Sequence, residues 1–235
     1  MHWRGVVGLT IAVAASATVL AVATRGFRVF TTDAARADAV RVRPIAVPDV
    51  ALLDMHGTPQ SVAQDGRSTI VDFVYTRCPS LCGTLGSVYQ RLQSEIVRRN
   101  AGDRVRLLTI SFDPAWDTPE RLRYYAIAMH PDPAIWSVTT VANPSTLSPL
   151  LDAFGVRVLA DGTNGFVHNA ALHVVNAKGQ LVSIHPLASS SASRRDAPGG
   201  DAVASRSVDA LDEVIAQALD AAIAHAPPRR LVVQP

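Results

Sequence analysis

One stretch of the chain decides its fold: Thr69-Ile70-Val71-Asp72-Phe73-Val74-Tyr75-Thr76-Arg77-Cys78-Pro79-Ser80-Leu81-Cys82. Its first half is rich in β-branched and aromatic side chains, which is typical of a buried strand. Beyond it, apolar residues recur with helical spacing and predict an amphipathic helix: Leu85, Val88, Tyr89, Leu92 and Ile96. The two cysteines of the chain, Cys78 and Cys82, therefore stand where a core strand runs into a helix.

Strand and helix patterns alternate along the rest of the chain. Strands are expected at 50–53, 60–62, 105–112, 136–141, 171–175 and 180–184. Helices are expected after Thr118, over 143–154 and after Ser207. This order predicts an α/β domain with helices on both faces of one sheet.

The composition excludes several classes of protein. With 235 residues and 48% hydrophobic side chains, the chain can form one domain with a sizeable core, so global disorder is excluded. Its 22 basic and 20 acidic residues give a net charge of +2, which argues against a nucleic-acid binder. Two cysteines are too few for a disulfide-rich scaffold or a four-cysteine zinc site.

The amino terminus predicts export. Residues 5–24 carry no charged side chain, and a helix of that length spans about 30 Å, the thickness of the hydrocarbon core of a bilayer. Two interpretations stay open. The segment is either a transmembrane anchor or a signal peptide with a cleavage site at Ala21-Val22-Ala23 or Ala37-Asp38-Ala39.

These patterns divide the chain into an anchor or signal segment at 1–28, a linker at 29–43, the α/β domain at 44–225 and a tail at 226–235. Within the domain, residues 188–206 are rich in Ser, Ala, Arg and Gly without periodicity, and they predict a surface loop or a disordered insertion. We expect the domain on the periplasmic face of a bacterial inner membrane, or in the periplasm if the segment is cleaved.

The spacing of Cys78 and Cys82 predicts reactive thiols. Residues at i and i+4 lie on one side of a helical turn, and the unpaired N–H groups and positive dipole end of a helix N-terminus favour thiolates. A disulfide that only staples the fold is the alternative, but closing so small a loop stabilises by only ~2 kcal/mol. The CxxxC spacing also leaves room for both sulfurs to hold one metal ion.

Four segments, in order, carry a family resemblance that covers roughly residues 45–225. Val71 to Cys82 resembles the strand and Cys-Pro-x-x-Cys motif of the SCO/SenC family, copper-handling proteins of thioredoxin fold. Residues 110–120 resemble that family's Ser-x-Asp-Pro-x-x-Asp-Thr-Pro segment, and residues 153–156 resemble the stretch that follows it. Phe166-Val167-His168 stands at the family's spacing before the hairpin turn at Gly179.

The resemblance implies a thioredoxin-like fold with a central mixed sheet, and a copper site formed by Cys78, Cys82 and His168. It implies a copper metallochaperone that delivers copper to an apo cytochrome c oxidase subunit carrying the binuclear copper site. Two alternatives stay open: a thiol–disulfide oxidoreductase that uses Cys78 and Cys82, and a binding module with inert cysteines. A classical enzyme is not expected. Gly83, Val167 and Asn169 depart from the family pattern beside the ligands, not at them.

The ligand chemistry is also reasonable by itself, because thiolates select soft ions and an added imidazole suits copper. We expect His168 on a loop before the strand at Ala171. His173 faces the opposite side and is read as structural. Asp113 and Asp117 are interpreted as turn and cap residues. Four further histidines are interpreted as surface or turn residues: His56, His130, His185 and His225.

Overall fold

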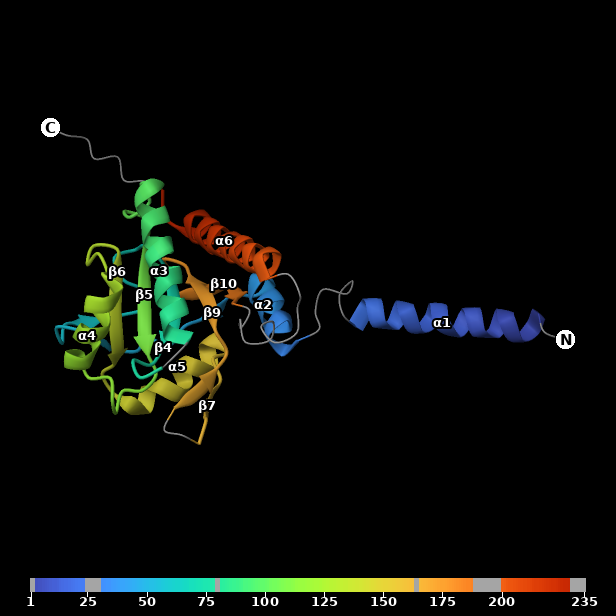
Figure 1. Ribbon diagram of the computed structural model, residues 1–235, viewed down its shortest axis with the longest axis horizontal. Helices are drawn as coiled ribbons and strands as arrows, with labels where there is room; N and C mark the ends of the chain where they lie inside the picture. Colours follow the sequence, from blue (N-terminus) through green and yellow to red (C-terminus); the bar gives the residue numbers. More distant parts are fainter. Residues whose placement is uncertain (1–2, 24–30, 79–80, 163–164, 188–199, 229–235) are drawn as a thin grey trace.

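The computed structural model describes residues 3–23, 31–78, 81–162, 165–187 and 200–228; the side chains of 4–6, 8–12, 21, 23, 81–85 and 200–211 lie outside the description. Its elements in chain order (Figure 1) are α1 (Trp3–Ala23), α2 (Thr32–Val42), β1 (Ile45–Ala46), β2 (Leu52–Asp54), β3 (Pro59–Gln60), β4 (Ser68–Val74), α3 (Leu81–Arg98), β5 (Val105–Ser111), α4 (Pro119–Met129), β6 (Trp136–Val141), η1 (Pro144–Thr146), α5 (Leu147–Phe154), β7 (Val158–Ala160), β8 (Phe166–His168), β9 (Ala171–Val175), β10 (Gln180–Pro186) and α6 (Gly200–His225).

One mixed sheet organises the described residues. Its strand order is β1-β10-β9-β4-β5-β6-β2-β3. The neighbours β4, β5 and β6 run parallel, and the remaining pairs are antiparallel. Every residue of β4 and β5 is buried, as expected for parallel strands covered on both faces. Strands β7 and β8 form a separate two-stranded ribbon.

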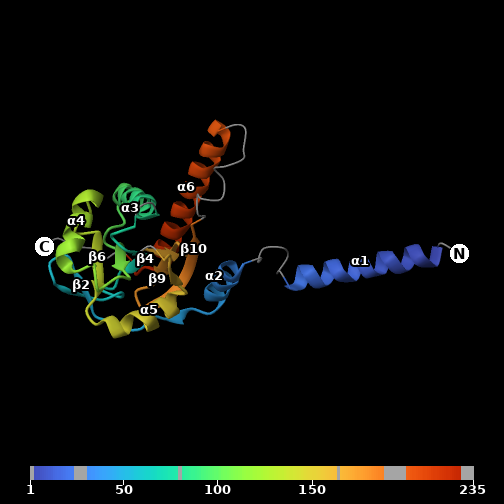
Figure 2. The ribbon, with the colours of Figure 1, turned by 60° about the horizontal axis from the view of Figure 1, so that its bottom comes forward.

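Helices cover both faces of the sheet, as predicted (Figure 2). Alternate residues of β4 point to opposite faces. Ile70 and Val74 join an apolar cluster with α3, α4 and α6, whereas Val71 and Phe73 join a second cluster with α2 and α5. The predicted α/β architecture with a central mixed sheet is therefore confirmed.

Two of the predicted local features are also found. The hairpin β2–β3 turns at Gly57, whose φ of 77° is a conformation that glycine adopts without strain. Helix α4 has Thr118 at its N-cap and Pro119 at the first position, and it ends at His130 in the left-handed region.

The segment at 29–43 is not simply a linker. Most of it forms helix α2, where the Thr31 side chain accepts a hydrogen bond from the Ala34 N–H. Ala37 and Val40 lie one turn apart and are buried, and the helix packs along β10. The small side chains of this helix make only a narrow apolar stripe, so the composition of the segment resembles that of a linker.

Helix α6 already begins at Gly200, so the carboxyl end of the predicted 188–206 insertion is helical. Residues 188–199 lie outside the described residues, and so do residues 229–235 of the predicted tail.

Helix α1 contains residues 5–23 of the apolar run for which a membrane anchor or signal segment is expected. In both views it lies apart from the sheet (Figures 1 and 2). Among the described residues, no helix meets the length and apolar character that a membrane crossing requires.

Candidate metal centre

Cys78 lies on a turn at the carboxyl end of β4. Its N–H donates a hydrogen bond to the Tyr75 carbonyl at 3.2 Å, and its half-buried side chain contacts the apolar clusters of both faces. Cys82 lies in the first turn of α3, and its side chain is outside the described part. The predicted strand–turn–helix placement of the cysteine pair is therefore found in the backbone.

A buried carboxylate fixes the backbone just before Cys78. Asp117 accepts hydrogen bonds from the Thr76 N–H at 2.9 Å, from the Thr76 hydroxyl, and from the Ser111 hydroxyl at 2.5 Å. Asp117 is fully buried, so three donors satisfy a charge that burial alone would destabilise. Asp117 is therefore more than the predicted helix-cap residue, because its carboxylate links the turn before Cys78 to the end of β5.

The neighbouring Asp113 pairs with Arg77, the residue before Cys78, at 2.6 Å. Both aspartates are thus engaged by the turn and form no separate acidic site. Sequence reasoning missed this linkage, although a signal was present. Polar residues at the carboxyl ends of adjacent parallel strands meet at one edge of a sheet, and Thr76 and Ser111 occupy such ends.

His168 is the last residue of strand β8, whereas the sequence predicted that it would lie on a loop. It is opposite Val158 in the ribbon. The ribbon is tied to the sheet through Tyr75, whose hydroxyl donates to the Phe166 carbonyl and accepts from the Phe166 N–H, both at 3.1 Å. The His168 ring packs edge-on against Phe112, with centroids 5.0 Å apart. Tyr75 and Phe112 directly follow β4 and β5, so His168 lies at the sheet edge from which the Cys78 turn emerges.

One nitrogen of His168 lacks a partner. Nδ1 is 3.2 Å from the Asn169 carbonyl, whereas Nε2 is buried and has no hydrogen-bond partner among the described residues. Burial lowers the pKa of His168, an effect that the Asn169 carbonyl partly opposes. The ring is therefore neutral at pH 7, with a proton on Nδ1 and a lone pair on Nε2. Buried polar atoms are seldom left unpaired, and an imidazole oriented by a carbonyl with its second nitrogen free fits a metal ligand.

The structure thus brings Cys78 and His168 to one edge of the sheet. Among the described side chains, no group of three or more His, Cys, Asp or Glu residues is close enough to hold a metal ion. The sulfur of Cys82, the third expected ligand, belongs to a side chain outside that description.

His173 is a packing residue, as predicted from the sequence. Its buried ring makes edge-on contacts with Phe73 and Phe154, with centroids 5.7 and 5.2 Å apart, and its Nδ1 is 3.3 Å from the Val71 carbonyl. Burial lowers the pKa of His173 to about 4, so the ring is neutral inside the apolar cluster.

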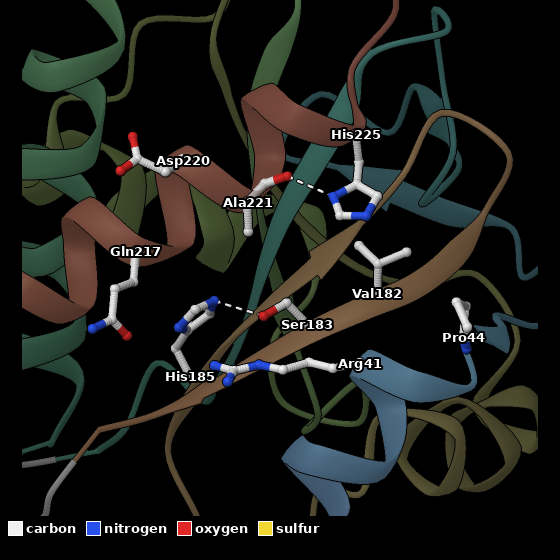
Figure 3. Close-up of a pocket in the computed structure, with 9 residues that line it drawn as sticks. All are labelled: Arg41, Pro44, Val182, Ser183, His185, Gln217, Asp220, Ala221 and His225. Atoms are coloured by element: carbon white, nitrogen blue, oxygen red, sulfur yellow. Dashed lines mark hydrogen bonds between the residues drawn. The ribbon is translucent and has the colours of Figure 1, made fainter.

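His185 is not a surface residue, which corrects the prediction. It is buried on β10, hydrogen-bonds Ser183 at 2.8 Å, and its pKa is lowered to about 4 by burial and by the nearby charge of Arg41. His225 is exposed on α6 and contacts the Ala221 carbonyl. Both histidines line a hollow of about 520 Å³ between α2, β10 and α6 (Figure 3). None of the described residues that line this hollow is a cysteine, and neither Cys78 nor His168 is among them.

The chain is similar to known proteins in sequence and in fold. The family model described as SCO1/SenC matches residues 43–196. A protein of Stutzerimonas stutzeri, named "Putative copper-binding protein", is 34% identical over 84 residues. That match covers 35% of this chain and 41% of the relative, so the chain spans less than half the length of this curated relative.

Solved structures share the fold. BsSco, described as a member of the Sco family of cytochrome c oxidase assembly proteins, has a TM-score of 0.57 at 18% identity, over 77% of this chain and 95% of that one. Arabidopsis thaliana ScoI with copper bound has a TM-score of 0.55 at 18% identity, over 74% and 99%. The expected thioredoxin-like fold is confirmed by this likeness. Since the family model matches more than half of its residues, the chain belongs to the SCO1/SenC family.

Proposed function

We propose that this protein is a copper metallochaperone. Cys78, Cys82 and His168 hold one copper ion, which is delivered to the copper centre of an apo cytochrome c oxidase subunit during assembly. One observation carries the proposal: the buried, unpartnered Nε2 of His168 lies at the sheet edge where the cysteine turn emerges.

The donor set suits copper. Two thiolates supply soft ligands, and the helix N-terminus at Leu81 favours their ionised form. The lowered pKa of His168 keeps the imidazole neutral, as a metal ligand must be. A thiolate pair with one imidazole favours copper over the oxygen-preferring ions Mg²⁺ and Ca²⁺.

The arrangement also suits release of the ion. His168 comes from a separate ribbon of two short strands, whereas Cys78 directly follows the central strand β4 and Cys82 lies in the first turn of α3. Detaching the imidazole opens a position for an incoming ligand of the recipient, while both sulfurs keep the ion bound. Transfer then proceeds by ligand exchange, without free copper in solution.

The relatives support the same assignment. The Stutzerimonas protein carries a copper-binding name, the Arabidopsis structure contains copper, and BsSco is described as a member of a family of oxidase assembly proteins. Export to the periplasmic face of a bacterial inner membrane, or to the periplasm, stays a prediction.

A second function is favoured by the position of Cys78 beside a helix N-terminus, which is typical of reactive thiols. Cys78 and Cys82 could cycle between dithiol and disulfide and reduce partner cysteines before metal insertion. The two functions are coupled, because only the dithiol supplies two thiolates to copper.

A competitive titration tests the proposal. The full, reduced chain is titrated with Cu(I) against a chromophoric chelator, alongside Cys78→Ser, Cys82→Ser and, as a control, His173→Ala. We expect one copper per chain in the parent and in the control, and loss of tight binding in both serine variants. Unchanged affinity in either serine variant would refute the metallochaperone assignment.

A further inference from the structure

A second feature lies beside the cysteine turn. A hollow of about 380 Å³ is lined by Thr76, Arg77, Trp116, Arg121, Tyr124 and Tyr125. We refer to these six residues as the aromatic–arginine surface. Arg77 directly precedes Cys78, so anything bound in this hollow lies next to the proposed metal ligand.

Two guanidinium groups stack on the ring of Trp116. The Arg121 Cζ lies 3.6 Å from the ring centroid and the Arg77 Cζ lies 4.5 Å from it. Arg121 also donates a hydrogen bond to the Trp116 carbonyl at 2.9 Å. Trp116 is still 39% exposed, so a large aromatic ring is held in a fixed orientation with one part open to solvent.

The charges in this surface are unequally matched. Arg77 has the Asp113 carboxylate as its partner, at 2.6 Å. Arg121 has no carboxylate within 4.0 Å among the described residues; its acceptor is a neutral carbonyl. One cation at the edge of the hollow is therefore free to pair with an added carboxylate.

Exposed apolar and aromatic side chains extend from the hollow along helix α4. Tyr124 and Ile127 lie about one turn apart on this helix, and each is 69% exposed. Exposed aromatic residues next to arginine are the composition of binding hot spots at protein interfaces, and adjacent exposed apolar side chains mark interaction sites.

We infer that the aromatic–arginine surface docks an acidic segment of the protein that receives copper from the Cys78 site. A carboxylate of that segment pairs with Arg121, and an apolar or aromatic side chain of the same segment fills the hollow against Trp116. This inference rests on the proposed function, because it names the chemistry of the partner at that site. A nucleic acid fits poorly, since one unmatched cation cannot neutralise a run of phosphates.

Two aromatic disulfides test the charge preference directly. The full, reduced chain reacts with 5,5′-dithiobis(2-nitrobenzoate), which carries two carboxylates, or with neutral 2,2′-dithiodipyridine. In each reaction a protein thiolate forms a new S–S bond as the probe's S–S bond breaks, and the released aromatic thiolate takes the electron pair. The neutral probe reports the intrinsic reactivity of the thiols, so the ratio of the two rate constants isolates recognition of the carboxylates.

We expect Arg121→Gln to lower this ratio about two- to fivefold, the range for one exposed ion pair, and Arg121→Glu to lower it further. The effect should fade at high salt because exposed charges are screened. Arg123→Gln is the matched control, since Arg123 is an exposed residue of the same helix outside the hollow. Its ratio should equal that of the parent. Equal ratios in the parent and Arg121→Glu would overturn the inference.

A peptide experiment extends the test to a protein-like partner. A synthetic peptide with one Trp and four Glu should slow the reaction of the parent with the dianionic probe, and its Gln-for-Glu counterpart should not. Neither peptide should slow Arg121→Glu. If the Gln peptide competes equally well, the acidic partner is wrong. Copper titration of the same variants separates the two proposals: Arg121→Glu keeps one copper per chain if both hold, and a parent that binds no copper refutes only the proposed function.

Discussion

Asp72 lies in the middle of β4 and is 1% exposed. Neither of its carboxylate oxygens has a hydrogen-bond partner among the described residues, and the nearby Tyr89 hydroxyl donates to the Ile70 carbonyl. Burial raises the pKa of Asp72 to about 7, and the side chains of Thr109 and Tyr89 offset this only in part. The carboxylate is therefore a destabilising group at neutral pH, and replacing it by the similarly shaped, uncharged Asn removes that cost.

The direction of the pH dependence follows from the raised pKa. The folded chain binds the Asp72 proton more tightly than the unfolded chain, whose carboxyl titrates near 3.8. Stability is therefore lost as pH rises from about 4 to about 7 and changes little above that range. A shift of about 3 units at about 1.4 kcal/mol per unit gives a cost of about 4 kcal/mol at high pH. Between pH 5 and pH 8 the change is about 2 to 3 kcal/mol.

Urea unfolding of the parent and of Asp72→Asn at pH 5 and pH 8 measures this effect. We expect the variant to gain about 2 to 3 kcal/mol on the parent between the two pH values. His173 and His185, whose pKa values burial lowers to about 4, titrate alike in both proteins and cancel from the comparison. A stability difference that is the same at both pH values would refute the reasoning, because it would mean that Asp72 keeps its ordinary pKa.

Four changes at or near the site have separate expected effects. Asp117→Asn removes the charged acceptor of three hydrogen bonds, so it should lower the free energy of unfolding by about 2 to 3 kcal/mol in urea titrations and weaken copper binding. His168→Ala should weaken copper retention in a chelator competition without slowing thiol–disulfide exchange. His173→Ala should leave copper binding unchanged. It should lower the free energy of unfolding by about 3 kcal/mol, because it leaves a cavity between Phe73 and Phe154. Oxidising Cys78 and Cys82 should abolish copper binding and shift the thermal midpoint only slightly, because the closed loop is small; a large shift would favour a structural staple.

The sequence predicts the centre of the fold well. The predicted strand at 69–75 is found as β4 (Ser68–Val74) because its β-branched and aromatic side chains pack on both faces, and the helical pattern through Ile96 gives α3. These signals are local and strong. Helix α2 is missed because the stripe of Ala37 and Val40 becomes apolar surface only when β10 lies beneath it.

The site is predicted less completely, and the reason is again tertiary. Strand β8 is short, and its position depends on hydrogen bonds between the Phe166 backbone and the hydroxyl of Tyr75, which is distant in sequence. The role of Asp117 depends on two parallel strands ending side by side, which spacing along the chain does not encode. His185 looks like a hairpin residue, yet α6 covers it.

The most direct test of the copper site is X-ray absorption at the copper edge of the loaded, reduced chain. The account predicts two sulfur neighbours and one imidazole nitrogen per copper, loss of the nitrogen in His168→Ala and an unchanged spectrum in His173→Ala. A spectrum that His168→Ala leaves unchanged, or a sulfur shell that survives when both Cys78 and Cys82 are serine, would contradict it.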